Sequence, residues 1–186
     1  MQKLMIFCAA FFVLSTAASA QNAQKFFTRD AKIKFSSDTP MEKIEGLSNS
    51  ATCILDPVTG DMAWQVLIKG FKFEKTLMQE HFNENYMESD KFPKATFSGK
   101  ITNLGEVNLA KDGTYNAAVS GKMTIHGVTK DFSTNGAITV GGGQIRLNAG
   151  FNVPTADYDI KIPSVVRDNI AKEITVLVDA PLAPKQ

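Results

Sequence analysis

Apolar and polar residues alternate along most of the chain, which is the pattern of half-buried antiparallel strands. From Met62 to Ile68, for example, every second residue is large and apolar. Turn residues separate the alternating runs, as at residues 56–61 and 141–143. The pattern predicts about eight strands, at residues 25–36, 43–56, 62–73, 94–109, 114–125, 129–140, 143–153 and 172–181. Eight strands with mostly short connections favour an all-β fold, either a small closed antiparallel barrel or a sandwich.

Two segments break this rhythm. Residues 74–90 lie between the third and fourth predicted strands and carry Met78, Phe82 and Tyr86 at a spacing of four, which predicts one helix. A single helix in an otherwise all-β chain has to lie over an opening or an edge of the sheet. Its apolar stripe fits packing against the barrel as well as contact with a ligand inside it. Residues 154–169 have no clear period, and we expect them to form a second cover.

Residues 1–20 have the features of a secretory signal peptide. Lys3 precedes an apolar run from Leu4 to Leu14, and small residues follow up to Ala20. The run is shorter than the ~20 apolar residues that a membrane-spanning helix needs. We therefore expect cleavage after Ala20 and no membrane anchor in the mature chain. Residues 21–186 are then expected to form one domain of a periplasmic or secreted protein.

Charge argues against nucleic acid as a partner. The whole chain has 20 basic and 19 acidic residues, and loss of Lys3 with the signal peptide leaves 19 of each. A neutral chain has no overall attraction for nucleic acid or for an anionic membrane. Cys53 is the only cysteine after residue 20, which excludes an intramolecular disulfide and any metal site built from several thiolates.

Signals of catalysis or metal binding are weak. His81 and His126 stand 45 positions apart, and no Cys, Asp or Glu lies at metal-ligand spacing around either. The sequence contains no nucleophile elbow, phosphate-binding loop or dinucleotide fingerprint. We therefore expect no catalytic residue, no metal and no cofactor. His126 fits a turn residue bonded to backbone or a polar contact at a barrel mouth, and His81 fits a solvated residue or a contact to a ligand head group.

The inward face of the predicted barrel mixes large and small side chains. An eight-stranded barrel can fill its interior or hold one small ligand, and small inward residues leave room for the latter. Alternating large and small residues can equally fill a tapering core, so both interpretations stay open. The large candidates are Trp64, Phe97, Tyr115, Met123 and Phe151, and the small ones are Gly99, Ala117, Gly121 and Ala149.

Three stretches resemble the YceI-like, polyisoprenoid-binding family. Residues 81–97 are similar to that family's helix-turn segment, which ends in aromatic-Pro-x-x-x-Phe. Residues 121–130, Gly-Lys-Met-Thr-Ile-His-Gly-Val-Thr-Lys, are close to its Gly-x-Leu-Thr-Ile-His-Gly-Val-Thr hairpin and form the most specific match. Residues 151–160 stand in the place of its penultimate strand and loop. Together with the strand count, the resemblance covers nearly the whole mature chain.

The resemblance implies a lipocalin-like barrel that is exported in bacteria and holds a polyisoprenoid or similar amphiphilic lipid in its lumen, without catalysis. The sequence departs from the family at residues 31–36, where the family often has a His-containing motif, and at residues 75–78, where it often has an Arg. The head group is therefore expected to differ or to be held differently, and a prenyl pyrophosphate is not implied.

The candidate binding site is the lumen of the predicted barrel and its mouth. The expected tail-binding residues are Trp64, Val66, Ile68, Phe71, Phe73, Leu77, Met78, Phe82, Tyr86, Phe97, Tyr115, Met123, Ile125, Phe132, Ile145 and Phe151, and the head-group candidates are His81 and His126. Two alternatives remain: a structural or partner-binding barrel with a filled core, and an enzyme that uses the lumen with one of the histidines as general base. A barrel that does not close fully would leave an edge for a homodimer.

Overall fold

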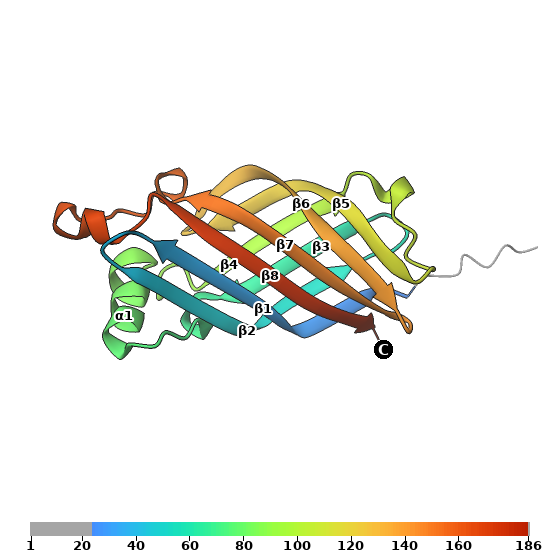
Figure 1. Cartoon of the computed structure of the whole chain (residues 1–186), viewed down its shortest axis with the longest axis horizontal. Helices are drawn as coiled ribbons and strands as arrows, with labels where there is room; N and C mark the ends of the chain where they lie inside the picture. Colours follow the sequence, from blue (N-terminus) through green and yellow to red (C-terminus); the bar gives the residue numbers. More distant parts are fainter. Residues whose placement is uncertain (1–23, 186) are drawn as a thin grey trace, which may run out of the picture.

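The computed structural model describes residues 24–185, which form one closed barrel of eight antiparallel strands (Figure 1). Every strand pairs with its neighbours in the sequence, and the first strand pairs with the last to close the barrel. The strands are β1 (Phe26–Asp38), β2 (Lys43–Leu55), β3 (Asp61–Leu67), β4 (Lys94–Ile101), β5 (Gly113–Ile125), β6 (Val128–Gly141), β7 (Gln144–Pro154) and β8 (Glu173–Pro184).

The predicted all-β barrel with one helix between the third and fourth strands is confirmed, and the sandwich alternative is wrong. Closure also removes the open sheet edge on which the expectation of a homodimer rested. The expected signal peptide lies outside the described residues. Among the described residues, no helix has both the length and the apolar character needed to cross a membrane.

The third and fourth strands are shorter than predicted. β3 stops at Leu67 because a short 3-10 turn, η1 (Ile68–Gly70), takes the chain out of the wall. Beyond it the backbone pairs with the wall again at an isolated bridge between Lys72 and Leu47. β4 likewise ends at Ile101 and is followed by the 3-10 turn η3 (Leu104–Glu106). The alternating apolar residues of both extensions point into the barrel from irregular backbone, so period two overestimates strand length here.

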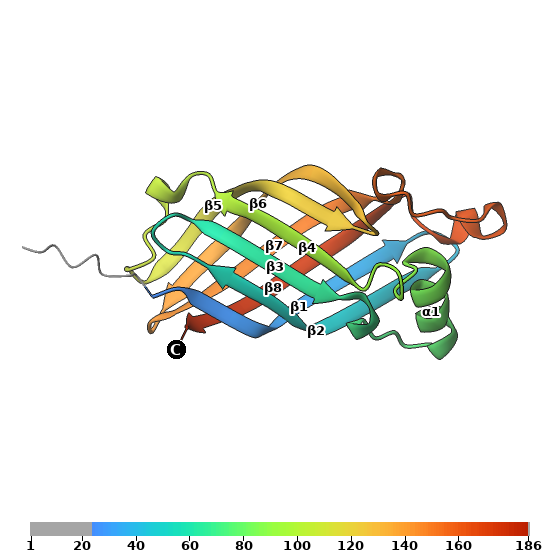
Figure 2. The same cartoon turned by 180° about the vertical axis from the view of Figure 1, so that it is seen from behind.

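The segment between β3 and β4 is helical over a shorter range than predicted. It consists of α1 (Thr76–His81) followed by a π-helical turn, η2 (Phe82–Tyr86). The second irregular segment, between β7 and β8, contains the 3-10 turns η4 (Thr155–Tyr158) and η5 (Ser164–Asn169). Both segments lie at the same end of the barrel, opposite the C-terminus, as both views show (Figures 1 and 2).

The other end of the barrel is filled by a hydrophobic core. Leu55, Ile145, Leu182 and Cys53 are almost completely buried there, together with Ala31 where β1 carries a register shift against β2. The free thiol of Cys53 is one of these core groups, and burial raises its pKa above the ordinary value. The barrel therefore has a solid end and a covered end, and the candidate site lies between them.

Candidate binding cavity

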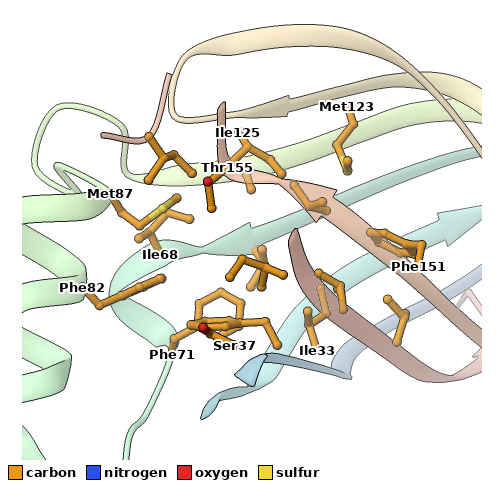
Figure 3. A pocket seen from close by; sticks show the side chains of 18 of the residues that line it. Ile33, Ser37, Ile68, Phe71, Phe82, Met87, Met123, Ile125, Phe151 and Thr155 are labelled. Carbon is orange, nitrogen blue, oxygen red and sulfur yellow. The ribbon is translucent and has the colours of Figure 1, made fainter. Parts of the chain in front are cut away.

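A long apolar cavity occupies the half of the barrel that faces α1. Its volume is about 580 Å³, within the roughly 300–1,000 Å³ typical of small-molecule sites. In Figure 3, Phe82 and Met87 reach into it from the helical segment, and Met123 and Phe151 lie deeper along the barrel. Many side chains that point into the barrel, such as Trp64, are only half buried because they face the cavity.

The cavity exists because small residues stand side by side across three strands. Ala117 on β5 pairs with Gly136 on β6, which in turn pairs with Ala149 on β7. One step nearer the solid end, the same strands carry the paired large residues Ile138 and Leu147. These two side chains are buried and form part of the cavity floor. The change from large to small at this level opens the lumen.

Gly99 and Gly121 do not contribute to this space, contrary to the sequence-based expectation. They face each other on β4 and β5, and the ring of Phe97 lies over the pair. A Cβ atom on Gly99 would come within 2.5 Å of that ring. The two glycines therefore make room for Phe97 and leave no room for a ligand, whereas Ala117 and Ala149 do line the cavity.

Four phenylalanine rings narrow the cavity below α1. The ring of Phe82 stacks on Phe35 at 5.1 Å between centroids and lies 5.0 Å from Phe73 and 5.8 Å from Phe71. The rings come from β1, from the chain after η1 and from η2, so their contacts fix the helical segment to the wall. Aromatic pairs of this geometry each contribute about 0.5–1.5 kcal/mol beyond area burial.

The charged groups that line the cavity lie at its open end. Glu42, in the turn between β1 and β2, accepts a hydrogen bond from Asn169 Nδ2 at 3.3 Å and lies 4.0 Å from Lys75 Nζ. The hydroxyl of Ser37 accepts a hydrogen bond from the Ala171 amide at 2.8 Å. Through these contacts the turn after β1 is connected to both covering segments. All but Ala171 also line the cavity, so its mouth carries charged and polar groups, whereas its interior is mostly apolar.

The structure brings together most of the predicted tail-binding residues. All of them line the cavity except Tyr115 and Ile145. Ile145 lies in the solid core below the floor and is 1% exposed. Tyr115 packs against the same core and donates a hydrogen bond from its hydroxyl to the Lys111 carbonyl at 3.0 Å. These two residues are therefore not cavity residues.

Sequence reasoning missed the contribution of the first and last strands. Ile33, Phe35 and Ser37 of β1 and Ile174, Val176 and Val178 of β8 line the cavity. All six follow a strict period of two, so the alternation that located the strands could also have assigned these residues to the inward face. The segment from Pro154 to Asn169 does cover the mouth as expected, and Thr155, Ile160 and Val166 line the cavity.

The two histidines lie in different environments. His81 is exposed on α1 and lines the cavity mouth. His126 does not line the cavity, and it occupies a turn in which both it and Gly127 have positive φ, of 50° and 76°. Its Nδ1 lies 3.1 Å from the Tyr158 carbonyl and its Nε2 lies 3.2 Å from a Glu88 carboxylate oxygen. His126 therefore joins the tip of the β5–β6 hairpin to both covering segments, as the turn-residue alternative requires.

Chemically, the cavity offers apolar contact and few reactive groups. Within residues 24–185, no three His, Cys, Asp or Glu side chains gather in a way that could hold a metal ion. Cys53 lies in the solid core with a raised pKa, so its thiol is poorly suited to act as a nucleophile. The arrangement is suited to hold a long apolar molecule with a polar group at the mouth.

Solved structures with similar folds include three bacterial proteins. A polyisoprenoid-binding domain from Saccharophagus degradans, implicated in plant cell wall breakdown, aligns with a TM-score of 0.75 and 12% identity over 87% of this chain and 99% of that chain. BcnA from Burkholderia cenocepacia aligns with a TM-score of 0.66 and 17% identity over 82% and 96% of the two chains. The YCEI protein of Campylobacter jejuni aligns with a TM-score of 0.53 and 15% identity over 100% and 99%.

At these identities the structural neighbours establish the fold alone, and no curated protein sequence matches the chain. The family is established by the sequence itself. The profile of the YceI-like domain matches residues 18–182, which covers β1 to β7, both covering segments and all of β8 except its last two residues. The chain therefore belongs to the family of YceI-like domain proteins.

Proposed function

We propose that this protein is an exported bacterial lipid-binding protein that holds a polyisoprenoid or a similar amphiphilic lipid and carries out no catalysis. The observation that carries the proposal is the apolar cavity of about 580 Å³, closed by packed core at one end and lined by charged groups at the other. This shape matches a molecule with a long hydrocarbon tail and one polar end. The name of the Saccharophagus degradans protein, a polyisoprenoid-binding domain of the same fold, supports the same ligand class.

The tail would be held by contact with hydrocarbon. Burial of one methylene group contributes about 0.8 kcal/mol, so a tail of about ten buried carbons has a favourable burial term of roughly 8 kcal/mol before the costs of ordering it. Phe151, Met123 and Val176 provide such contacts in the lower part of the cavity. A charged anchor is therefore unnecessary for binding.

The head group would lie near His81 and Lys75 at the mouth. Both side chains line the open end, and Glu42 next to them adds a negative charge. A mouth with both signs of charge suits a head group that is neutral or weakly polar better than a pyrophosphate. His126, which is bonded to Tyr158 and Glu88 behind the mouth, is not needed for this contact.

Export is the second part of the proposal. Residues 1–20 would be removed as a signal peptide, which leaves residues 21–186 as one barrel domain in the periplasm or outside the cell. The neutral mature chain supports a lipid partner rather than nucleic acid. Of the alternatives, a filled core conflicts with the cavity, and an enzyme with His126 as base conflicts with the place of that residue outside the cavity.

Native mass spectrometry of protein purified from its own cell envelope tests this function. The expected result is a bound mass that is lost when the protein is unfolded, and uptake of a fluorescent prenyl or acyl probe by the emptied protein. Absence of both a bound lipid and probe uptake would overturn the proposal. Retention of binding after replacement of both His81 and His126 is expected, because tail contact supplies most of the affinity.

A further inference from the structure

Three large apolar side chains are exposed around the mouth of the cavity. Met41 is 72% exposed in the turn between β1 and β2, Leu77 is 61% exposed on α1, and Val165 is 89% exposed on η5. The other exposed large apolar residues within 24–185 lie elsewhere: Leu47, Leu67 and Leu177 on strands of the wall, and Val58 in the turn at the solid end.

The three segments that carry these side chains are joined to one another. Glu42 follows Met41 directly and contacts both Lys75, two residues before Leu77, and Asn169 at the end of η5. Figures 1 and 2 show the three segments at the same end of the barrel. We call Met41, Leu77 and Val165 the apolar rim.

The apolar rim is continuous with the interior. Leu77 is exposed to solvent and lines the cavity as well, so apolar surface extends from the rim into the lumen. Side chains held in water at the tips of separate segments, around the opening of an apolar cavity, are suited to enter an apolar phase next to that opening. A lipid bilayer is such a phase, and it also contains amphiphilic molecules of the class that fits the cavity.

The charged side chains around the apolar rim indicate whether contact with a bilayer would be apolar or electrostatic. Ionic side chains of both signs surround the apolar rim, and one pair, Lys75 and Glu42, lies 4.0 Å apart. In the sequence of the second covering segment Arg167 stands beside Asp168, and Lys172 stands beside Glu173 at the start of β8. This arrangement gives no excess of positive charge toward anionic lipids. Contact would therefore depend on insertion of apolar side chains and not on lipid charge.

We propose that the apolar rim docks the mouth of the barrel on a lipid bilayer, so that a lipid passes between membrane and cavity without crossing water. This inference rests on the proposed lipid-binding function and adds the surface through which the cavity is loaded. The partner of the apolar rim is the bilayer, and the experiment below distinguishes it from a protein that delivers the lipid.

The test compares variants at the two ends of the barrel. The double variant Met41→Ser/Val165→Ser alters the rim outside the cavity lining, and Val58→Ser, at a residue 65% exposed, is the matched control at the solid end. Each is produced from the full sequence, and its N-terminus is read by mass spectrometry, because an uncleaved apolar segment at residues 4–14 would itself bind vesicles. The readouts are flotation with phosphatidylcholine vesicles and the rate at which a fluorescent prenyl lipid leaves those vesicles for the protein.

The double variant is expected to float at least about tenfold less and to extract the lipid correspondingly more slowly, because two apolar side chains no longer enter the bilayer. The Val58→Ser control and 0.5 M salt are expected to change neither readout. Loading of the same probe from dilute detergent, without vesicles, is expected to be equal in all forms.

Each contrary result has a distinct meaning. Equal flotation and extraction by the double variant, or no flotation of the unaltered protein, would overturn docking on a bilayer and would favour delivery by another protein. Failure of the unaltered protein to load from detergent would overturn the proposed function itself. Strong loss of flotation in salt would overturn the apolar mode of contact.

Discussion

Substitution of Ala149 by leucine distinguishes a barrel with a ligand-binding cavity from a barrel with a filled core. Ala149 lies in the row of small residues with Ala117 and Gly136, above the floor formed by Ile138 and Leu147. Leucine carries three more carbon atoms than alanine, and at this position they would project into the cavity. The side chain would take space that the tail of a ligand otherwise occupies.

The size of the effect follows from the hydrocarbon displaced. If the new side chain excludes about three methylene groups of the ligand, at about 0.8 kcal/mol each, binding weakens by about 2.4 kcal/mol, or roughly 50-fold. The stability of the empty protein should stay equal or rise, because the added carbons enter free space and bury apolar surface. In a filled core the same substitution would cost about 1–3 kcal/mol through overpacking.

The assay pairs probe binding with urea unfolding on the same samples. Ala63→Leu is the matched control, because Ala63 is exposed on the outer face of β3 and does not line the cavity. It should change neither quantity. Lower stability of Ala149→Leu with unchanged probe affinity would refute the argument, because it would mean that the space at Ala149 is already filled and that the ligand binds elsewhere.

Three further predictions concern other parts of the barrel. Gly99→Ala should lower the free energy of unfolding by about 1–3 kcal/mol, measured in urea, because its Cβ would clash with the Ser120 carbonyl oxygen of the neighbouring strand and meet the Phe97 ring at 2.5 Å; an unchanged midpoint would contradict this. The Arg146 guanidinium lowers the pKa of Asp179, so the pair contributes stability above the ordinary carboxyl value of 3.8 that is lost as the pH falls through the folded value. The free energy of unfolding, measured in urea, should be lower at pH 3 than at pH 7. Asp179→Asn should reduce this difference by at most about 1 kcal/mol, because the pair is partly exposed. The same difference in the variant and in the unaltered protein would show that the pair does not contribute to stability. Cys53 should resist iodoacetamide at pH 8 in the folded protein and react fully in urea, as followed by mass, because burial both shields the thiol and raises its pKa; rapid labelling of the folded chain would place it at the surface.

The alternation of apolar and polar residues was sufficient to predict most of the barrel, because each strand has one solvent-exposed face and one apolar face. The prediction for β5, residues 114–125, differs from the observed strand by one residue. It failed at the end of β3, where Phe71 and Phe73 keep the period of two although the chain has left the wall after Leu67. Their side chains meet Phe82 of the next helical segment, and the alternation within a strand contains no information about that contact.

The candidate site was harder to predict than the fold because a period of two assigns a residue to a face and not to a depth. Tyr115, Ala117 and Val119 have the same parity on β5, yet Tyr115 packs with the solid core and the other two line the cavity. The boundary between them depends on the register with β6, which places Ala117 opposite Gly136. Gly99 shows the same limit, since only the structure reveals that the space above it is occupied by a neighbouring ring.

The division of the barrel into a solid end and a covered end explains where hydrogen bonds and ion pairs between distant segments are needed. At the solid end, buried side chains such as Leu55 and Leu182 hold the strands together by packing. At the covered end the cavity interrupts that packing, and polar contacts between distant segments add to the aromatic packing around it: Glu42 with Asn169 and Lys75, and His126 with Tyr158 and Glu88. These contacts surround the cavity without entering its apolar interior. A lipid tail would then supply the missing packing, so the bound molecule would be part of the core of the protein as well as its cargo.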